Sequence, residues 1–469
     1  MTELPTELPT EMSVEEALVF GTRLHRLGQL DQAEEVYGAV LAIAPEHPDA
    51  LQFMGILRYA RGKRPEGIAL MQQSIALVPN APGLHVNLGN MLLDSARADE
   101  ATEAYERAAA LGAPSAVLMN NLGVLRRHQQ RLPEAEAAYR QAAQIDPEFI
   151  DAYNNLGNLL ASQGQHEAAL DQYCKALEMH PNSPATRRLA ALALCVLGRA
   201  EAAARIYREW LAEEPDNPLP QHYLAACTGE GVPQRASDAY VEATFDAFAD
   251  SFDAKLEQLT YRAPGLVARA VADIAAAASG DGPPVKFDML DAGCGTGLCG
   301  PLLAPHAKRL VGVDLSAGML AKARQRGGYD ELVKAELVDD LRARPAAFDV
   351  IVSADTLCYF GPLEEAAEAA FGALRDDGHL VFTVEALRLA EPSAADTANP
   401  PASPPAGFRL NHHGRYSHSR PYIERTLLAA GFEAATFASA ILRREAGRSV
   451  EGFVVTARRP GAAHLPAIG

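Results

Sequence analysis

Small and bulky residues recur with a period of 34 positions along the first half of the chain. A small residue opens each period, a second follows twelve positions later, and a bulky residue comes four positions after that. The first small position holds Gly21, Gly55, Gly89, Gly123, Gly157 and Ala191. The second holds Ala33, Gly67, Ala101, Ala135, Ala169 and Ala203. The bulky position holds Tyr37, Met71, Tyr105, Tyr139, Tyr173 and Tyr207. A period of this length is typical of stacked helical units.

Each period predicts two antiparallel helices. The small residues let the two backbones approach closely, and the bulky residue fills the space between successive units. A proline then ends the second helix, because it cannot continue the hydrogen-bonded ladder. These prolines are Pro45, Pro79, Pro147, Pro181 and Pro215, with Pro114 one position late in the third unit. The pattern resembles the tetratricopeptide repeat and predicts an α-superhelical solenoid of six units over residues 14–217, with a capping or linking segment over 218–239.

Asparagine recurs with the same period at Asn87, Asn121 and Asn155. We expect this position to face the concave groove of the solenoid. An amide carries both a donor and an acceptor, so it can pair with an extended peptide backbone. The spacing resembles the asparagine ladder in the repeats of O-linked N-acetylglucosamine transferases, which implies a protein or peptide partner. The alternative is that these amides are ordinary consensus residues that bond to solvent.

The second half of the chain alternates short apolar runs with helical ones. The β-like runs are FDMLDA, RLVGV, LVKAEL, DVIVSA, HLVFTV, FEAATF and EGFVVTA. Such alternation predicts a mostly parallel sheet with helices on both faces. We expect this α/β domain to span residues 240–460 and to begin with a helix on which Phe245, Phe248 and Phe252 share one apolar face.

The candidate chemistry lies in the stretch LDAGCGTGLCG, where a strand ends at Asp291. Gly293, Gly295 and Gly297 then predict a tight turn that a ligand can approach closely. Asp314 ends the next strand, where a carboxylate can accept the hydroxyl groups of a ribose. The glycines also fit a dinucleotide-binding pattern. S-adenosylmethionine is favoured over a dinucleotide, because a carboxylate at Asp291 repels a pyrophosphate and attracts an ammonium group.

The stretch from LDAGCGTGLCG to RLVGVDLSAGMLAKAR resembles the first two motifs of class I methyltransferases. This resemblance implies a Rossmann-like domain with a seven-stranded, mostly parallel sheet whose last strand is antiparallel. It also implies that the preceding helix, FDAFADSFDAKL, covers the cofactor. The residues that it places around S-adenosylmethionine are Asp291, Gly293, Gly295, Gly297, Asp314, Leu315 and Met319. The whole chain resembles a bacterial family of repeat-bearing predicted methyltransferases.

The adenine of the cofactor would meet an acidic residue and a backbone amide after the third strand. The run AELVDD offers Glu336 with Leu337, or Asp339 with Asp340. We prefer Glu336 and Leu337, because they lie nearest the end of that strand.

The fourth strand would place Ser353 to Asp355 beside the transferred methyl group. A general base is needed only when the acceptor must lose a proton. Candidates for this role are Asp355, Tyr359, His412, His413 and His418. The three histidines follow a Pro- and Ala-rich stretch that predicts either a mobile loop over the acceptor or a plain surface loop.

Composition adds limits to this picture. The 469 residues carry a formal net charge of -18, and phosphate binding needs Lys and Arg, so we do not expect a nucleic-acid partner. The first residues show no secretory signal, and no apolar run is long enough to span a membrane. The six cysteines form no CxxC pair, which argues against a structural metal and favours a reducing cytoplasm.

These observations predict a cytoplasmic, S-adenosylmethionine-dependent methyltransferase whose repeat array recruits a protein or positions the substrate. The alternative is a scaffold whose α/β domain binds the cofactor as a sensor without catalysis. The acceptor stays open between a small molecule and a protein.

Overall fold

The computed structural model describes residues 12–95, 97–112, 114–249, 252–280, 282–387, 407–445 and 448–461. Contacts within the chain divide it into two compact units. One unit holds the described residues up to Ala161 together with Asp171–Pro181, and the other holds Ser162–Leu170 together with the chain from Asn182. No helix in the ranges given is long and apolar enough to cross a membrane.

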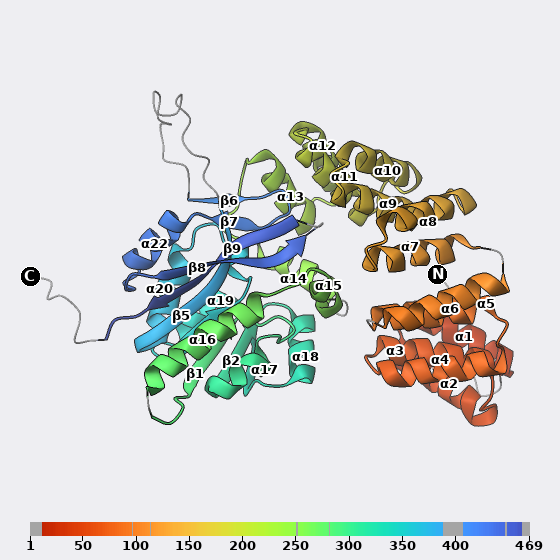
Figure 1. Cartoon of the computed structure of the whole chain (residues 1–469), viewed down its shortest axis with the longest axis horizontal. Coiled ribbons are helices and arrows are strands. Elements are labelled where there is room, and N and C mark those ends of the chain that lie inside the picture. Colours follow the sequence, from red (N-terminus) through yellow and green to blue (C-terminus); the bar gives the residue numbers. More distant parts are fainter. Residues whose placement is uncertain are drawn as a thin grey trace, which may run out of the picture. The chain divides into compact units, whose positions relative to one another are not determined.

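Pairs of helices follow one another through the first half of the chain, as the period of 34 predicts (Figure 1). The pairs are α1 (Val14–Arg26) with α2 (Leu30–Ile43), α3 (Pro48–Ala60) with α4 (Arg64–Leu77), α5 (Pro82–Asp94) with α6 (Ala98–Leu111), α7 (Ala116–His128) with α8 (Leu132–Ile145), α9 (Ile150–Ser162) with α10 (His166–Met179), and α11 (Pro184–Val196) with α12 (Ala200–Glu213). A further helix, α13 (Pro218–Thr228), begins where the side chain of Asn217 accepts the N–H of Leu219 at 2.9 Å. The predicted capping segment therefore starts as a helix.

The bulky residue of each repeat occupies space that a small residue leaves free. A Cβ placed on Gly21 would lie 2.6 Å from Cε1 of Tyr37, and one on Gly89 would lie 2.5 Å from Cε1 of Tyr105. Carbon atoms do not approach so closely, so glycine is required at both positions. The Tyr37 ring also stacks on Phe53 of the next repeat, with 5.8 Å between ring centroids. The ring thus packs inside its own repeat as well as between repeats, whereas the sequence predicted only the second contact.

The described part of the α/β domain contains a sheet of nine strands. Seven of them run in the order β3-β2-β1-β4-β5-β9-β8. Strands β1 to β5 are parallel, and β9 is antiparallel to both of its neighbours. The seven strands are β1 (Phe287–Ala292), β2 (Ala307–Asp314), β3 (Glu331–Lys334), β4 (Phe348–Ser353), β5 (Leu374–Ala386), β8 (Thr436–Glu445) and β9 (Arg448–Arg458). This order includes the antiparallel last strand that the sequence predicted.

Helices cover both faces of the sheet, because side chains of a buried strand alternate between its faces. Met289 of β1 packs with Val267, Val271 and Leu303 on one face, whereas Leu290 packs with the helices of the other face. The helices of this part are α14 (Asp238–Phe248), α15 (Phe252–Gln258), α16 (Ala263–Ser279), α17 (Gly300–Leu303), α18 (Ala317–Arg326), α19 (Leu337–Ala343), α20 (Glu364–Ala373) and α22 (Arg420–Ala429). Two short 3-10 turns lie at Ala304–His306 and Leu357–Tyr359.

Three predicted segments differ from the structure. The run FEAATF, predicted to form the sixth strand, overlaps only the start of β8, because β8 begins at Thr436 rather than at Phe432. The predicted loop with the three histidines contains a hairpin, β6 (Phe408–Leu410) and β7 (Tyr416–His418), which pairs with the end of β5. The leader is two helices, α14 and α15, rather than one. Residues 388–406 of the predicted loop lie outside the described residues.

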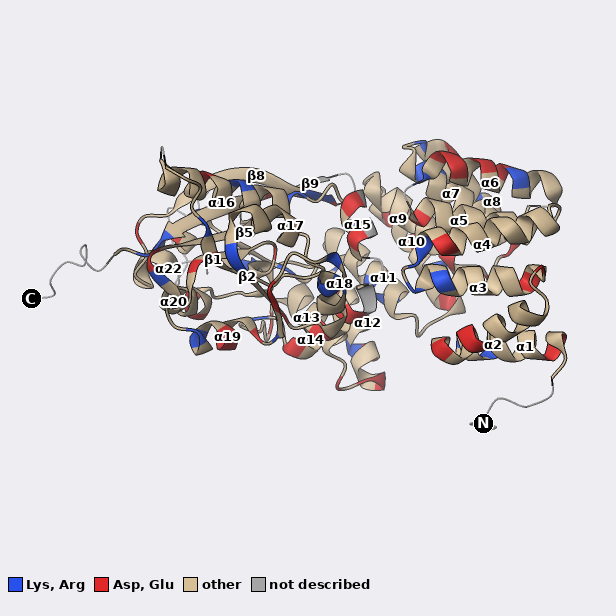
Figure 2. Ribbon diagram, turned by 90° about the horizontal axis from the view of Figure 1, so that it is seen from below, with Lys and Arg blue, Asp and Glu red and all other residues tan. Residues whose placement is uncertain are grey.

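Charged residues of both signs are interspersed over the helices of the array and over the α/β part (Figure 2). Some of them pair between consecutive repeats: Arg58 Nη2 of α3 lies 2.7 Å from Glu34 Oε1 of α2. Solvent-accessible pairs at the protein surface contribute little stability, about 0–1 kcal/mol each, and this pair is partly buried. The expectation that nucleic acid is not a partner stays a prediction.

The sixth helical pair groups with the sheet rather than with the earlier repeats. Within that unit, Tyr207 of α12 stacks on Tyr223 of α13, with 5.9 Å between ring centroids. The His222 ring of α13 lies 4.0 Å from the Tyr240 ring of α14. The boundaries predicted from the sequence, 14–217, 218–239 and 240–460, follow the repeat pattern and stay a prediction.

Candidate functional site

A glycine turn (residues 293–297) follows β1 at the carboxyl end of the sheet. The φ angles of Gly293, Gly295 and Gly297 are 79°, 54° and 81°, a region that favours glycine. The N–H groups of Gly293 and Cys294 both donate to the carbonyl of Val313 in β2, at 2.8 and 2.9 Å. The turn is therefore held over the ends of β1 and β2, where α/β sheets bind their ligands.

Gly293 meets the chain that follows β4. The Thr356 hydroxyl donates to the carbonyl of Gly293 at 3.3 Å. A Cβ placed on Gly293 would lie 2.7 Å from Cβ of Thr356, so a larger residue would push the two loops apart. The glycine turn and the loop after β4 therefore fix each other's position.

Asp291 lies beneath the turn with no exposed surface. The Tyr329 hydroxyl donates to its Oδ2 at 2.6 Å, whereas its Oδ1 has no partner among the described residues. Burial raises the pKa of Asp291 to about 7. A buried carboxylate oxygen without a donor fits a cationic group, and the ammonium of S-adenosylmethionine is one.

Asp314 ends β2 beside the same turn. The N–H of Gly295 donates to its Oδ2 at 2.8 Å, and the N–H of Ser316 donates to its Oδ1 at 2.9 Å. Burial raises the pKa of Asp314, and these two backbone donors act in the opposite direction. Leu315 is half-buried, and Met319 is buried at the start of α18. Asp314 is thus fixed by the backbone while each oxygen keeps a lone pair for a ribose hydroxyl.

Glu336 precedes α19 directly, two residues after the end of β3. Its side chain accepts the N–H of Asp339 at 2.9 Å, so it caps the helix. Leu337 is buried, Asp339 is exposed, and Asp340 pairs with Arg344 at 3.1 Å. The other carboxylate oxygen of Glu336, Oε1, lies 4.0 Å from Arg235 Nε. Our preference for Glu336 and Leu337 stays a prediction.

Two acidic residues connect the leader helices to the cofactor loops. Asp246 of α14 accepts the Ser316 hydroxyl and the N–H of Gly318, the latter at 3.2 Å. Asp253 of α15 accepts the Thr296 hydroxyl at 2.5 Å. The leader thus touches both the glycine turn and the start of α18. Sequence reasoning missed both residues, because their spacing says nothing about the loops that they contact.

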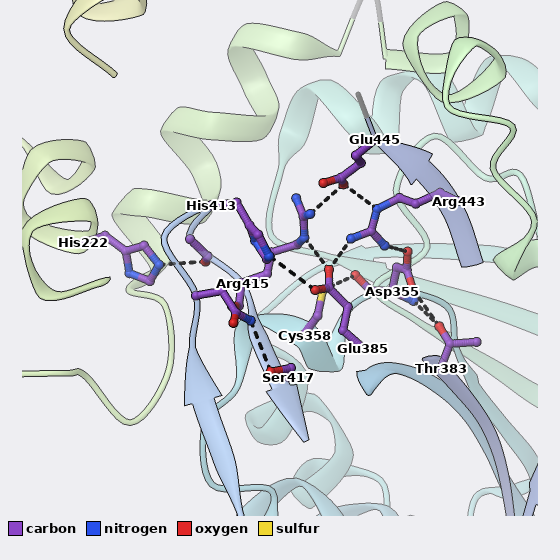
Figure 3. A network of polar contacts seen from close by, with 12 residues as sticks. His222, Asp355, Cys358, Thr383, Glu385, His413, Arg415, Ser417, Arg443 and Glu445 are labelled. Atoms are coloured by element: carbon purple, nitrogen blue, oxygen red, sulfur yellow. Dashed lines mark hydrogen bonds and ion pairs between the residues drawn. The ribbon is translucent and has the colours of Figure 1, made fainter. Parts of the chain in front are cut away.

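Asp355 lies two residues beyond the end of β4 with a left-handed backbone, at a φ of 54°. Its N–H donates to the Thr383 hydroxyl oxygen at 2.8 Å, and that hydroxyl donates back to Asp355 Oδ1 at 2.8 Å. Arg443 Nη1 donates to Asp355 Oδ2 at 2.7 Å (Figure 3). Burial raises the pKa of Asp355, and the Arg443 guanidinium opposes that rise.

Asp355 belongs to a charge cluster, which we define as Asp355, Glu385, Arg415, Arg443 and Glu445 (Figure 3). Arg415 of the β6–β7 hairpin donates to Glu385 and to Glu445, at 2.6 Å each. Arg443 donates to the same two carboxylates. Although burial acts to raise it, Arg415 and Arg443 lower the pKa of Glu445 to about 2. The cluster therefore holds two cations and three acids at the carboxyl ends of β4 and β5.

Two histidines that we considered as bases serve other contacts. His418 is fully buried, and its Nε2 lies 2.8 Å from the carbonyl of Gly361. His413 Nε2 lies 3.5 Å from Glu385 Oε2, at the edge of the charge cluster. Burial lowers the pKa of each to about 4. Both rings are neutral at pH 7, and their surroundings favour structural roles.

The two remaining candidate bases, His412 and Tyr359, make contacts outside the charge cluster. His412 Nδ1 is 3.1 Å from the carbonyl of Ala226, so this histidine joins the hairpin to α13. Tyr359 packs edge-on against Phe245 of α14, with 5.5 Å between ring centroids. The Tyr359 hydroxyl has no hydrogen-bond partner in the described ranges, and burial raises its pKa. Tyr359 is thus the tyrosine that brings the loop after β4 into contact with the leader.

The three periodic asparagines are half-buried. Asn121 Nδ2 donates to Asn90 Oδ1 at 2.7 Å, and Asn155 Nδ2 donates to Asn120 Oδ1 at 2.9 Å. The Asn87 side chain has no hydrogen-bond partner within the part of the chain that the structure describes. Two of the amides therefore connect neighbouring repeats and still keep free donor and acceptor positions. A peptide-binding role for Asn87, Asn121 and Asn155 stays a prediction.

Of the residues in the charge cluster, only Asp355 was a candidate from the sequence alone. Glu385 carried a usable signal, because it is an acid directly after the apolar run HLVFTV, as Asp314 is after its own strand. Arg443 and Thr383 carried none, because they lie within strands whose pairing the sequence does not fix. No group of three or more His, Cys, Asp or Glu in the described ranges suits a metal ion.

Both parts of the chain match known protein families. Residues 290–382 match a family described as a methyltransferase domain. Residues 114–182 match one tetratricopeptide repeat family, and residues 18–82, 54–116 and 152–218 match a second. These matches confirm the predicted repeats and the predicted methyltransferase domain. They do not favour the alternative of a scaffold that senses the cofactor without catalysis.

Curated relatives match the methyltransferase part only in portions. Methyltransferase-like protein 27 of Homo sapiens is 32% identical over 136 residues, which are 29% of this chain and 52% of that protein. Malonyl-(acyl-carrier protein) O-methyltransferase of Enterobacter lignolyticus is 33% identical over 95 residues, which are 20% of this chain and 38% of that protein. A solved S-adenosylmethionine-dependent methyltransferase from Mesorhizobium loti is 25% identical, with a TM-score of 0.30 over 37% of this chain and 92% of that one. This chain thus spans about half, or less, of the curated relatives it matches.

Proposed function

We propose that this chain, which joins tetratricopeptide repeats to a methyltransferase domain, transfers the methyl group of S-adenosylmethionine to an acceptor that the repeats help to recruit. The observation that carries the proposal is the buried Asp291, whose Oδ1 has no donor among the described residues beneath the glycine turn. An isolated buried carboxylate is costly, and a bound cation removes that cost.

The residues around the turn suit each part of the cofactor. Asp291 would hold the ammonium, with the backbone of Gly293 and Gly295 beside the methionine. Asp314 would accept the ribose hydroxyls, because its backbone donors hold both of its oxygens in place. Four further residues would surround the adenine: Leu315, Met319, Glu336 and Leu337. Gly297 completes the turn, Asp253 holds α15 against it, and Asp246 holds α14 against the start of α18.

The cofactor supplies an electrophilic methyl group on a cationic sulfur, so the protein has only to orient the acceptor, exclude water and handle a proton. Asp355 is our candidate for the proton. It follows β4 at the carboxyl end of the sheet, and burial raises its pKa, which makes its carboxylate a stronger base. Tyr359 is a second candidate, because its hydroxyl has no partner in the described ranges and lies in the same loop. His418 is the least suited of the three, because its Nε2 is engaged with a backbone carbonyl.

We propose that the array binds a protein or peptide through Asn87, Asn121 and Asn155. The free amide positions on these residues support this role. We also place the reaction in the cytoplasm: the six cysteines are free, and Cys195 and Cys227 stay unbonded with their sulfurs 3.1 Å apart. The names of the relatives point to different acceptors, so we leave the acceptor's class to experiment.

Calorimetric titration of S-adenosylmethionine into the full chain tests cofactor binding. We expect saturable binding that Asp314→Ala abolishes and that Asp377→Asn, an exposed acid paired with Arg458, leaves unchanged. Absence of binding at millimolar cofactor would refute the proposal.

Transfer of a radiolabelled methyl group into cell extract and small-molecule pools tests catalysis. Label in a protein band or a small-molecule fraction is the expected result. Cofactor binding without any labelled product would instead support the sensor alternative. Replacing Asn87, Asn121 and Asn155 together by alanine should lower labelling of a protein acceptor and leave cofactor affinity unchanged.

A further inference from the structure

Arg443 is a buried cation that lies far along the chain from the cofactor motifs. Its side chain is 5% exposed on β8. Every nitrogen of its guanidinium is engaged: Nη1 with Asp355 at 2.7 Å, Nε with Glu445 at 2.6 Å, and Nη2 with Glu385. A guanidinium with all its nitrogens used has one fixed orientation, so it can fix its partners in turn.

The N–H and both carboxylate oxygens of Asp355 have hydrogen-bond partners. Thr383 binds both its N–H and its Oδ1, and Arg443 binds its Oδ2 (Figure 3). Its left-handed backbone is tolerated by aspartate but is uncommon outside glycine, and such positions persist where the surroundings determine them. The next residue, Thr356, lies against Gly293 of the glycine turn. The position of Asp355 therefore sets the position of the loop that meets the cofactor turn.

The charges around Asp355 act in opposite directions. Burial and Glu385 raise its pKa, whereas Arg443 and Arg415 lower it. Three further titratable groups face it and remain uncharged at pH 7, because burial raises their pKa values: Tyr261, Cys299 and Cys358. The nearest cation is Arg443, so its removal would leave a buried carboxylate without its ion pair.

We propose that Arg443 is a positioning residue for methyl transfer: its guanidinium holds the Asp355 carboxyl in one orientation beside the acceptor. This rests on the function proposed above. It also assigns a role to β8, a strand that the methyltransferase family match at residues 290–382 does not reach. Glu385 and Glu445 complete the arrangement by holding Arg443, and Arg415 binds the same two carboxylates.

The decisive measurement is the pKa of the Asp355 carboxyl, which does not require a known acceptor. It can be followed by carbon-13 NMR of aspartate-labelled protein, with Asp355→Asn used to assign the signal. In Arg443→Met we expect this pKa to rise by roughly 1–3 units, because an opposite charge has been removed. In Arg443→Lys we expect most of the rise to be absent. Arg458→Gln, on an exposed arginine of β9, is the matched control and should cause no shift.

Binding and turnover supply the second readout. Affinity for S-adenosylmethionine should change less than about threefold in Arg443→Met, whereas methyl transfer into the labelled pool should fall at least tenfold at pH 7, of the order expected for loss of a proton-transfer group. The acidic limb of the activity profile should move to higher pH in the same variant. Arg443→Lys should recover part of the activity.

An unchanged Asp355 pKa in a folded Arg443→Met protein would overturn the proposal. If Arg443→Met does not fold, Arg443→Gln tests the same contact, because it keeps hydrogen-bond donors and removes the charge: the Asp355 pKa should rise. An unchanged Asp355 pKa in Arg443→Gln would then overturn the proposal. Failure of the wild-type chain to bind the cofactor would refute the proposed function instead, and the pKa comparison would still decide the role of Arg443.

Discussion

Asp291 and Asp314 end neighbouring strands and meet the same glycine turn, yet they have different surroundings. Asp314 receives two backbone N–H groups, whereas Asp291 receives one hydroxyl, from Tyr329. Burial is therefore poorly compensated at Asp291, and its pKa rises to about 7. Near neutral pH the carboxyl is partly protonated before any ligand arrives. A cation bound there would favour the ionised form.

Cofactor binding should therefore release a proton. We expect a release of about half a proton per molecule near pH 7, falling towards zero at pH 9, where Asp291 is already ionised. The cofactor affinity should rise with pH between about 6 and 8 for the same reason. Calorimetry in buffers of different ionisation enthalpy measures the release. A binding enthalpy that does not depend on the buffer at pH 7 would contradict this account.

The ionised carboxylate of Asp291 should also lower the free energy of unfolding of the protein without cofactor. The carboxyl of an unfolded aspartate loses its proton near pH 4, whereas that of folded Asp291 does so near pH 7. The free energy of unfolding should then fall as pH rises from about 4 to about 7, by up to about 4 kcal/mol. Asp291→Asn should remove this loss, so it should raise the melting temperature at pH 8 and not at pH 4. Asp377→Asn is the exposed control, and equal melting temperatures of Asp291→Asn and wild type at pH 8 would argue against a buried charge.

At this scale the sequence predicted some residues well and others not at all. Asp291, Asp314 and the glycines follow one another within a short stretch, so their order alone places them at adjacent strand ends. Arg443 and Thr383 reach Asp355 from other strands. Their contact depends on strand register, which no local spacing encodes.

The helical pairs show how one position can determine the packing of an element. Gly89 on α5 leaves the space that the Tyr105 ring of α6 occupies. Gly38 lies on α2 with its nearest neighbour at 3.9 Å, the flexible end of Met54. A methyl group therefore has no room at Gly89 and has room at Gly38.

Alanine should therefore have opposite effects at these positions. We expect Gly89→Ala to lower the free energy of unfolding by about 2 kcal/mol or more, because the methyl group collides with a buried ring. Gly38→Ala should raise it by up to about 1 kcal/mol through better helix propensity. Thermal unfolding of the two variants compares them directly. A neutral Gly89→Ala would mean that Tyr105 can move aside.

The tyrosine hydroxyls permit a second comparison between repeats. The Tyr105 hydroxyl donates to Asn90 Oδ1 at 2.7 Å, whereas the buried Tyr37 hydroxyl has no partner among the described residues. Tyr105→Phe should cost about 1 kcal/mol, and Tyr37→Phe should be neutral or slightly stabilising. Unfolding of both variants in urea tests this. An equal loss in both would show that the hydroxyl of Tyr37 finds a partner in solution.

The elements themselves were largely predictable. The period of 34 placed the helical pairs, and the apolar runs placed β1, β2, β4, β5 and β9. The β6–β7 hairpin was not predicted, because its strands have three residues each and pair with the end of β5 rather than forming a long apolar run. Strand β8 starts later than the run FEAATF and extends through the polar stretch LRRE, which carries Arg443 into the sheet.

On the scale of the whole molecule, the repeat pattern and the contacts divide the chain at different points. The pattern ends near residue 217, whereas α11, α12 and α13 group with the sheet. His222 of α13 lies 2.8 Å from the carbonyl of Gly414 in the hairpin, and His412 lies 3.1 Å from Ala226 of α13. Helix α13, which follows the last repeat, therefore supports the hairpin that carries Arg415.

Shortened chains should reflect this division. A chain that begins at Asn182 should fold and bind S-adenosylmethionine with the affinity of the full chain. A chain that begins at residue 240 loses α13, so its hairpin should be poorly held and its melting temperature lower. Circular dichroism and calorimetric titration measure both properties. Equal stability of the two shortened chains would show that α13 is not part of the methyltransferase fold.

The pairing of a glycine with a tyrosine in the same repeat has a consequence for how this chain can change over generations. A repeat such as the one from Ala116 to Phe149 contains both the glycine, Gly123, and the tyrosine that packs on it, Tyr139. A second copy inserted beside it would therefore meet suitable neighbours on either side. The array can therefore lengthen or shorten by in-frame duplication or deletion of 34 codons at a time. Such a change alters the length of the array and leaves every residue of the methyltransferase domain as it is.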